Sequence, residues 1–206
     1  ITLVFLICPP MLHYPSPLSK LLENFNRLSK PTSELLASKL KLCVHDKNSK
    51  ILSIGNNDKY VYFVITGLIR KFYINNGKEV TSSIFTSNDI IISFNSFFNQ
   101  TTSTEAIETI NETELYKLHY EDYLFLAETR PDFIEIMSNI TLDHINSLED
   151  YNKLLKIKTP FDRYKMFEKL FPKYRGKLPN SILASYLNIS YSEISRIRAK
   201  ILKSYY

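Results

Sequence analysis

NSILASYLNISYSEISRIRAKILK, residues 180–203, is the stretch that decides the architecture of the C-terminal part of this chain. Ala184 stands where two crossing helices leave no room for a larger side chain. The positions that two steeply crossing helices must bury are all apolar: Leu183, Leu187, Ile189, Ile194 and Ile197. This spacing predicts a helix-turn-helix, a unit that typically binds DNA.

The turn and the start of the second helix carry residues suited to each task. Asn188 lies at the turn, and asparagine is the commonest non-glycine residue to accept a left-handed backbone. Ser190 and Glu193 have the spacing of a capping box, in which each side chain binds the free backbone N–H of the other residue. We therefore expect the second helix to begin at about Tyr191.

The second predicted helix has an apolar face and a polar face that suits a DNA major groove. Arg196 lies on the polar face, where its guanidinium can donate two hydrogen bonds to guanine O6 and N7. Arg198 and Lys200 lie towards its edges, and we expect them to contact phosphates. The polar face comprises Ser192, Ser195, Arg196, Ala199 and Lys203. The alternative is an ordinary helical hairpin with a solvated polar face.

Positive charge is concentrated in the same region of the chain. Residues 158–206 contain 11 Lys and Arg against 3 Asp and Glu, whereas residues 1–157 contain 15 against 18. A segregated basic domain is typical of proteins that neutralise DNA phosphates. A basic solubilising tail would not carry core-spaced apolar residues such as Phe167, Leu170 and Phe171.

The N-terminal residues give little indication of a membrane or an oxidising environment. Residues 1–8, ITLVFLIC, are apolar but far fewer than the roughly 20 that a membrane span needs, so we expect no membrane partner. We expect residues 1–17 to lie outside the core fold. Cys8 and Cys43 cannot build a disulfide framework, which favours a cytoplasmic protein.

The middle of the chain has the pattern of short antiparallel strands. Val, Ile, Tyr, Phe and Thr are frequent there, and the segment 75–77, Asn-Asn-Gly, supplies the positive φ angles of a tight hairpin. The predicted strands are 51–54, 60–66, 68–75, 79–85, 90–94, 104–110 and 114–119, enough for a jelly-roll-like barrel. Residues 18–42 are predicted to form two short helices divided by Pro31, the second capped by Thr32 or Ser33.

Two further helices are predicted after the strands. The first is short, residues 120–128, and Pro131 opens a long helix that runs to about Lys158. Its apolar residues are spaced by three and four, which suits a partner helix in a dimer. They are Phe133, Met137, Ile140, His144, Leu148, Tyr151 and Leu155. The alternative is that this side lies on the barrel, and we expect some of both.

The order of barrel, long helix and helix-turn-helix resembles the Crp/Fnr family of bacterial transcription regulators, in particular its short Bacteroidetes-type members. The most specific segments are YFVITGLIRKFYINNGKEVT at 62–81, RYKMFEKLFP at 163–172 and ILASYLNISYSEISRIRAKI at 182–201. The resemblance implies a cyclic-nucleotide-binding-like barrel that senses an effector, a homodimer held by the long helix, and a palindromic operator. It also implies that Arg196, Tyr191 and Ser192 occupy the three base-recognition positions.

The resemblance fails where family members bind cyclic AMP. Those members carry a Gly-Glu pair for the ribose and, about ten residues later, Arg-Ser or Arg-Thr for the phosphate, whereas this chain has Ile92-Ser93 and Ser103-Thr104. The carboxylate and the guanidinium that would make charge-assisted contacts are missing. We therefore expect an effector pocket at Ser93, Ser103 and Thr104 that is degenerate and does not bind cyclic AMP tightly.

The residues also argue against catalysis and against a metal or other cofactor. The four histidines, His13, His45, His119 and His144, are scattered without an H-x-H pair. No P-loop, G-x-S-x-G elbow or iron–sulfur ligand set is present. The chain ends shortly after the helix-turn-helix without a clear wing, so Lys173, Arg175 and Lys177 are candidates for additional phosphate contacts.

Together these features predict an α+β chain in four parts: an N-terminal segment 1–17, a sensor barrel 18–130, a dimerisation helix 131–158 and a DNA-binding domain 159–206. Pro160 interrupts the helical pattern, and we expect a hinge at residues 158–161 through which the barrel sets the angle of the recognition helices. The alternative function is a small-molecule sensor module with little intrinsic DNA binding.

Overall fold

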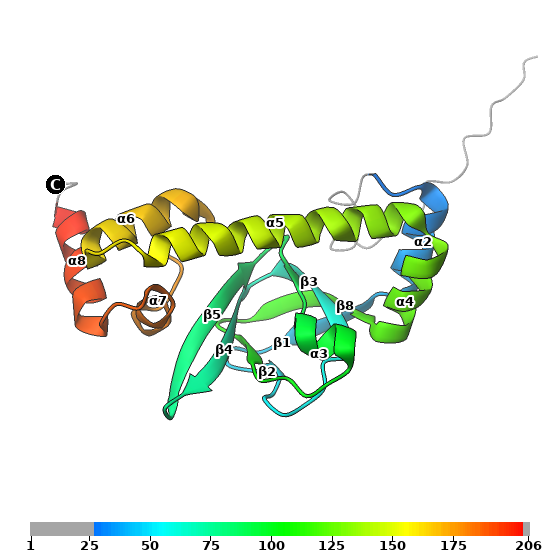
Figure 1. The fold of residues 1–206 in the computed structure, drawn as a ribbon, viewed down its shortest axis with the longest axis horizontal. Coiled ribbons are helices and arrows are strands. Elements are labelled where there is room, and N and C mark those ends of the chain that lie inside the picture. The colour runs from blue at the N-terminus through cyan, green and yellow to red at the C-terminus, as the bar shows by residue number, and fades with distance from the viewer. Residues whose placement is uncertain (1–26, 204–206) are drawn as a thin grey trace, which may run out of the picture.

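The computed structural model describes residues 27–203, with side chains to residue 201. A long helix, α5 (Pro131–Leu155), crosses the molecule, with a β domain beneath its middle and a helical domain at its C-terminal end (Figure 1). The predicted segment 1–17 and most of the first predicted helix lie outside the described residues. Within residues 27–203, no helix has both the length and the apolar character needed to cross a bilayer.

The β domain consists of two antiparallel four-stranded sheets, in the orders β1-β8-β3-β6 and β2-β7-β4-β5. The predicted jelly-roll-like barrel is thus present as two sheets that do not close into one barrel. The strands are β1 (Lys41–His45), β2 (Lys50–Leu52), β3 (Tyr60–Thr66), β4 (Leu68–Asn75), β5 (Lys78–Thr86), β6 (Ile90–Ile91), β7 (Ala106–Thr109) and β8 (Thr113–His119).

Strand β3, YVYFVIT, is apolar along nearly its whole length because both of its faces are buried. Its Tyr62 and Val64 belong to the core between the two sheets, together with Ile69 and Ile107. Its alternate residues, among them Phe63, pack against the helices on the other side. A strand that is covered on both faces needs a continuous apolar run rather than an alternating one.

The β4–β5 hairpin forms at the predicted turn. Asn76 and Gly77 adopt φ angles of 50° and 73°, and Asn75 pairs with Lys78 across the turn. Both central residues therefore have the positive φ that the right-handed twist of the strands favours. The hairpin extends away from α5 and passes beside the helical domain (Figure 1).

Three predicted boundaries around the β domain were wrong. Helix α2 spans Lys30–Lys39 and includes Pro31 in its first turn, so it begins before the predicted cap at Thr32 or Ser33. Residues after Lys39 were predicted as helix, but β1 begins at Lys41. The predicted strand 90–94 is shorter in the structure, where β6 ends at Ile91 and helix α3 (Phe94–Asn99) starts at Phe94. Pairing with β8 overrides the local pattern of β1.

Helix α5 covers two cores at once, which corrects much of the predicted dimer seam. Phe133 and Met137 are 0% and 2% exposed in the single chain because they pack on α4 (Tyr120–Thr129) and on the outer face of β3 and β8. Neither side chain can reach a partner helix. The remaining predicted seam residues are half-buried, except for exposed Leu148: Ile140, His144, Tyr151 and Leu155.

In the middle and towards the end of α5, residues of the predicted apolar side contact other elements of the same chain. His144 stacks on Phe94 of α3 with 5.3 Å between ring centroids. Tyr151 stacks on Tyr186 of the helical domain at 4.5 Å, and its hydroxyl donates to the Tyr186 carbonyl oxygen at 2.7 Å. A different stripe is exposed on this helix, with Ile134, Leu142, Ile145 and Leu148 each at least 38% exposed.

The C-terminal domain is helical throughout and packs against the β domain. Its elements are α6 (Pro160–Leu170), a 3₁₀ turn (Pro172–Tyr174), α7 (Asn180–Leu187) and α8 (Tyr191–Lys203). Its core also takes in Leu68, Ile84 and Ile110 from the sheets and Leu154 from α5. The predicted break at Pro160 is confirmed, since α5 ends at Leu155 and Pro160 lies in the first turn of α6.

Gly67, between β3 and β4, tests this account of the β domain. It has a φ of 109°, and a Cβ there would lie 2.8 Å from the Thr113 Cα and 2.9 Å from the Glu112 carbonyl oxygen. We expect Gly67→Ala to lower the free energy of unfolding by about 2–4 kcal/mol because strain and backbone overlap add. Gly55→Ala is the matched control, since its φ is 86° but nothing lies within 4 Å. Equal losses in urea unfolding would contradict the account.

Candidate DNA-binding surface

Helices α7 and α8 form the predicted helix-turn-helix. Asn188 adopts the left-handed conformation, with φ 50° and ψ 52°, and ends α7. The Ile189 N–H then donates to the Ala184 carbonyl oxygen at 3.0 Å, which satisfies one of the free carbonyls at the end of the helix. The predicted core residues are all buried: Leu183, Ala184, Leu187, Ile189, Ile194 and Ile197.

The predicted capping box opens α8. The Glu193 N–H donates to Ser190 Oγ at 3.2 Å, and the Ser190 N–H donates to Glu193 Oε2 at 3.2 Å. The Ser190 hydroxyl also donates to Glu193 Oε2 at 2.7 Å. These hydrogen bonds favour the ionised carboxylate and hold the pKa of Glu193 below its ordinary value. The start of the recognition helix is thus fixed by local contacts.

Arg163 of α6 closes the back of the turn. Its Nη1 donates to the carbonyl oxygens of Leu187 and Asn188, both at 2.9 Å. Its Nε and Nη2 donate to the Ile157 carbonyl oxygen at 3.1 and 2.7 Å. One guanidinium therefore joins the end of α7 to the segment between α5 and α6. The left-handed turn leaves backbone carbonyls without partners inside the helix. The sequence alone does not indicate which side chain donates hydrogen bonds to them, so the role of Arg163 was not predicted.

Arg198 is directed into the domain and away from its outer surface. Its Nη1 donates to the Leu178 carbonyl oxygen at 3.0 Å and to Asn180 Oδ1, and its Nε donates to the Tyr164 hydroxyl at 3.3 Å. This arrangement joins α8 to α6 and to the start of α7. The geometry favours a structural role for Arg198 over the predicted phosphate contact.

The other predicted recognition residues lie on the outer face of α8. Tyr191 is 61% exposed, and Ser192, Arg196 and Lys200 are exposed as well. Lys200 Nζ lies 5.1 Å from the centre of the Phe161 ring. Ser195 is half-buried, and its Oγ accepts from Asn180 Nδ2 at 3.1 Å. Lys203 belongs to α8, but its side chain is outside the described part.

Of the three loop cations predicted to contact phosphates, Lys173 has a different partner. Its Nζ lies 2.7 and 2.8 Å from the two carboxylate oxygens of Asp89, in the turn between β5 and β6. This ion pair corrects the prediction for Lys173, because the ammonium already bridges the helical domain to the β domain. Arg175 and Lys177 remain exposed.

Further hydrogen bonds hold the helix-turn-helix against β5. The Thr81 N–H donates to Ser185 Oγ at 2.9 Å, and the Ser185 hydroxyl donates to the Glu79 carbonyl oxygen at 3.3 Å. The Tyr174 hydroxyl donates to the Ile84 carbonyl oxygen at 2.6 Å. Hydrogen bonds between segments that are distant in the chain leave no local signal in the sequence, so these contacts were not predicted.

The structure brings together two of the three predicted effector-pocket residues. Ser93 and Ser103 are buried, and their hydroxyl oxygens lie 3.3 Å apart, whereas Thr104 is exposed. The Ser103 hydroxyl donates to the Glu105 carbonyl oxygen at 2.8 Å. The Glu105 carboxylate lies 3.2 Å from Lys71 Nζ, in a largely buried ion pair. The Ser93, Ser103 and Glu105 side chains therefore already have partners within the protein.

Metal ligands are not gathered in the described part of the chain. Within residues 27–203, no group of three or more His, Cys, Asp and Glu side chains is arranged to hold a metal ion. The described histidines lie apart, for example His144 on α5 and His119 at the end of β8.

Arg198 and Lys200 allow the structural and electrostatic roles to be separated. We expect Arg198→Gln to lower the melting temperature, since three internal hydrogen bonds are lost, and to leave the salt dependence of DNA binding unchanged. We expect Lys200→Gln to leave the melting temperature unchanged and to reduce the slope of log affinity against log salt concentration by about 1. An unchanged melting temperature together with a smaller salt slope for Arg198→Gln would indicate that Arg198 contacts DNA.

The sequence matches no protein-family model and no curated protein. Solved structures do match. FixK2 from Bradyrhizobium japonicum superposes with a TM-score of 0.70 at 17% identity, over 80% of this chain and 85% of that chain. A Eubacterium rectale protein assigned to the Crp/Fnr family of transcriptional regulators gives 0.69 at 16% identity, over 90% and 88%.

A third similar structure is CLP from Xanthomonas campestris, a c-di-GMP-responsive global regulator that links cell–cell signalling to virulence gene expression. It superposes with a TM-score of 0.66 at 17% identity, over 85% of this chain and 93% of that chain. Each of the three superpositions covers at least 80% of this chain and at least 85% of the other chain. The predicted resemblance is confirmed at the level of architecture: the chain has the fold of the Crp/Fnr regulators.

Proposed function

We propose that the chain is a dimeric, DNA-binding transcription regulator of the Crp/Fnr type. The observation that carries this proposal is the outer face of α8, where Tyr191, Ser192 and Arg196 are exposed on a capped helix in a basic domain. None of these three side chains contributes to the hydrophobic core of the domain. A recognition helix needs such a face, because its side chains must reach the edges of bases in the major groove.

The contacts with DNA divide by chemistry. Arg196 is the residue that distinguishes bases, since an exposed guanidinium can donate two parallel hydrogen bonds to guanine. Lys200, Arg175 and Lys177 contribute positive charge at the surface, and phosphate neutralisation by such residues supplies most of the sequence-independent affinity. Arg163 and Arg198 hold the helices in place and contact no base.

Dimerisation in this proposal uses the exposed stripe of α5. Leu142, Ile145 and Leu148 follow one another at intervals of three residues, and Ile134 lies eight residues before Leu142. Exposed apolar side chains at this spacing are typical of a helix–helix seam. Two copies joined along α5 would present two α8 helices to two half-sites of a palindromic operator.

The β domain serves as a sensor or a scaffold with a degenerate nucleotide pocket. Ser93 and Ser103 replace the charged residues that cyclic AMP requires, and their hydroxyls contact each other. The turn at Pro160, fixed by Arg163, is the joint through which the β domain and α5 set the orientation of α8. The alternative is a small-molecule sensor module with little intrinsic DNA binding, and a salt series separates the two.

DNA binding tests the proposal directly. We expect affinity for duplex DNA to fall steeply as salt rises, because binding releases counterions. Arg196→Ala is expected to remove about 1–3 kcal/mol of discrimination between a preferred site and random duplex. Lys47→Ala, an exposed cation on the β domain, is the control and should change neither quantity. Weak binding that is insensitive to salt and to Arg196 would support the sensor module.

The proposed seam gives a second test. Ile145→Glu places a charge in the exposed α5 stripe, and we expect it to shift the protein from dimer to monomer in size-exclusion chromatography with light scattering. Phe125→Glu on α4 is the matched control, because Phe125 is similarly exposed, at 48% against 47% for Ile145, but lies outside the stripe. A wild-type protein that is monomeric at every concentration would rule out the seam.

A further inference from the structure

A cavity of about 680 Å³ lies where the β domain, α5 and the helical domain meet. Its walls come from all three parts: Ser83, Phe85 and Asp89 from β5 and the following turn, Asp143 and Ser147 from α5, and Phe171, Lys173 and Tyr186 from the helical domain. The volume is in the range of small-molecule sites. Ser93, Ser103 and Thr104 do not line it, so this is a different place from the degenerate nucleotide pocket.

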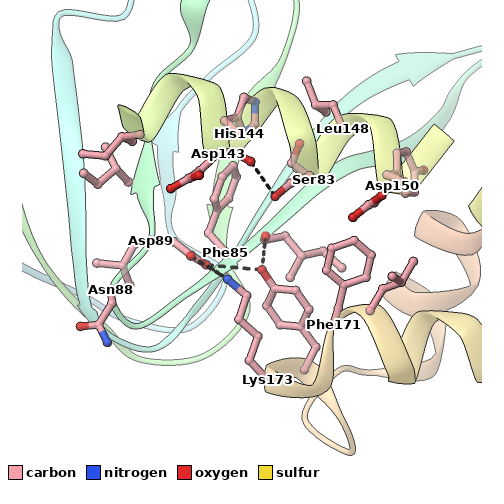
Figure 2. A pocket seen from close by; sticks show the side chains of 18 of the residues that line it. Ser83, Phe85, Asn88, Asp89, Asp143, His144, Leu148, Asp150, Phe171 and Lys173 are labelled. Atoms are coloured by element: carbon pink, nitrogen blue, oxygen red, sulfur yellow. Dashed lines mark hydrogen bonds and ion pairs between the residues drawn. The ribbon is translucent and has the colours of Figure 1, made fainter. Parts of the chain in front are cut away.

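The cavity has an apolar wall that can hold an organic ligand. Phe85 of β5, Ile140 of α5 and Phe171 of the helical domain line it, and two tyrosines, Tyr174 and Tyr186, join them. Figure 2 shows Phe171 and Lys173 facing α5 across the cavity. Aromatic and aliphatic side chains from separate elements form the kind of lining that binds the body of a small molecule.

The charges in the cavity disfavour an anion. Three aspartates line it, Asp89, Asp143 and Asp150, against two cations, Arg27 and Lys173. The Lys173 ammonium is neutralised by both oxygens of Asp89 at 2.7 and 2.8 Å. Burial lowers the pKa of the His144 imidazole, and the positive charge of Lys71 adds to this effect, so His144 contributes no charge at neutral pH.

Asp143 is the carboxylate best placed to meet a cation. Asp150 lies 3.2 Å from Lys153 Nζ, whereas the Asp143 carboxylate forms no ion pair within residues 27–201. In Figure 2 the side chains of Asp143 and Asp150 lie on the side of α5 that faces Lys173 and Phe171. A charge-assisted hydrogen bond from an ammonium to Asp143 would therefore displace no internal partner.

We propose that this cavity binds an amphipathic organic cation, with its amine at Asp143 and its apolar body among Phe85, Ile140 and Phe171. A phosphate-bearing ligand would face net negative charge, and of the two cations in the lining Lys173 is already paired with Asp89. Because the ligand contacts the β domain, α5 and the helical domain together, it stabilises their present arrangement. The effect of this stabilisation on DNA binding rests on the proposed function, in which the arrangement of the domains positions α8. Binding of the ligand to the cavity does not rest on it.

Phenethylamine and 3-phenylpropionate are the probes for this site, since both carry a phenyl ring on a short chain but differ in the sign of the charge. Calorimetric titration of the full chain at neutral pH, without DNA, measures both. We expect phenethylamine to bind at least about tenfold more tightly than 3-phenylpropionate, which corresponds to about 1.4 kcal/mol. Tighter binding of the anion, or no binding of either probe, would overturn the proposal.

Three variants place the binding. We expect Asp143→Asn to weaken phenethylamine about fivefold or more, as the loss of a charged hydrogen bond requires. Glu149→Gln removes an exposed carboxylate of the same helix outside the cavity and should have no effect. Ser147→Phe places a large side chain in the cavity and should abolish binding. Asp143→Asn and wild type should have the same melting temperature, which shows that weaker binding by Asp143→Asn does not come from a loss of folding. Equal affinities in all four proteins would overturn the site. Since no DNA is present, failure here leaves the DNA-binding proposal untouched.

Discussion

Helix α5 packs into the cores of both domains, and the rest of the structure depends on this constraint. Its first turns seal the outer face of the β domain through Phe133 and Met137, and its last turns enter the core of the helical domain through Leu154. One rigid helix thereby fixes how far apart the two domains lie. It also decides which apolar side chains remain for a partner, because the face that packs inward is no longer available. The cavity between the domains follows from the same geometry, since α5 forms one of its walls.

Contacts between the helical domain and the β5 region fix how the two domains are oriented. Asp89, in the turn after β5, accepts from Lys173 and also from the Thr86 N–H at 2.8 Å. Ser185 makes a second contact, on α7 itself, so the helix before the turn is held by the β domain directly. Tyr191, Ser192 and Arg196 on α8 take no part in these contacts and are exposed. A domain that is fixed on one side and open on the other can pass a change in the β domain to the DNA-binding surface, which is how we interpret the architecture.

Local chemistry explains which parts of the fold the sequence could predict. The turn at Asn188, the Ser190–Glu193 box and the hairpin at Asn76-Gly77 each depend on neighbouring residues, and all three formed as predicted. Two of the predictions that were wrong depend on distant partners. Lys173 pairs with Asp89, far away in the chain. Phe133 and Met137 had the spacing of a seam, but periodicity cannot say whether an apolar stripe meets the same chain or another. The cavity left no sequence signal, because its walls come from three separate regions.

Selection of bound sequences from a random duplex library tests the central claim most directly. A dimer that presents two α8 helices should enrich inverted half-sites whose centres lie about one helical turn apart, roughly 34 Å. Enrichment of such a palindrome by the full-length protein, with loss of the palindrome in a monomeric variant, is the result that we predict. A protein that enriches no sequence, or enriches a single half-site without two-fold symmetry, would contradict the account of a dimeric regulator.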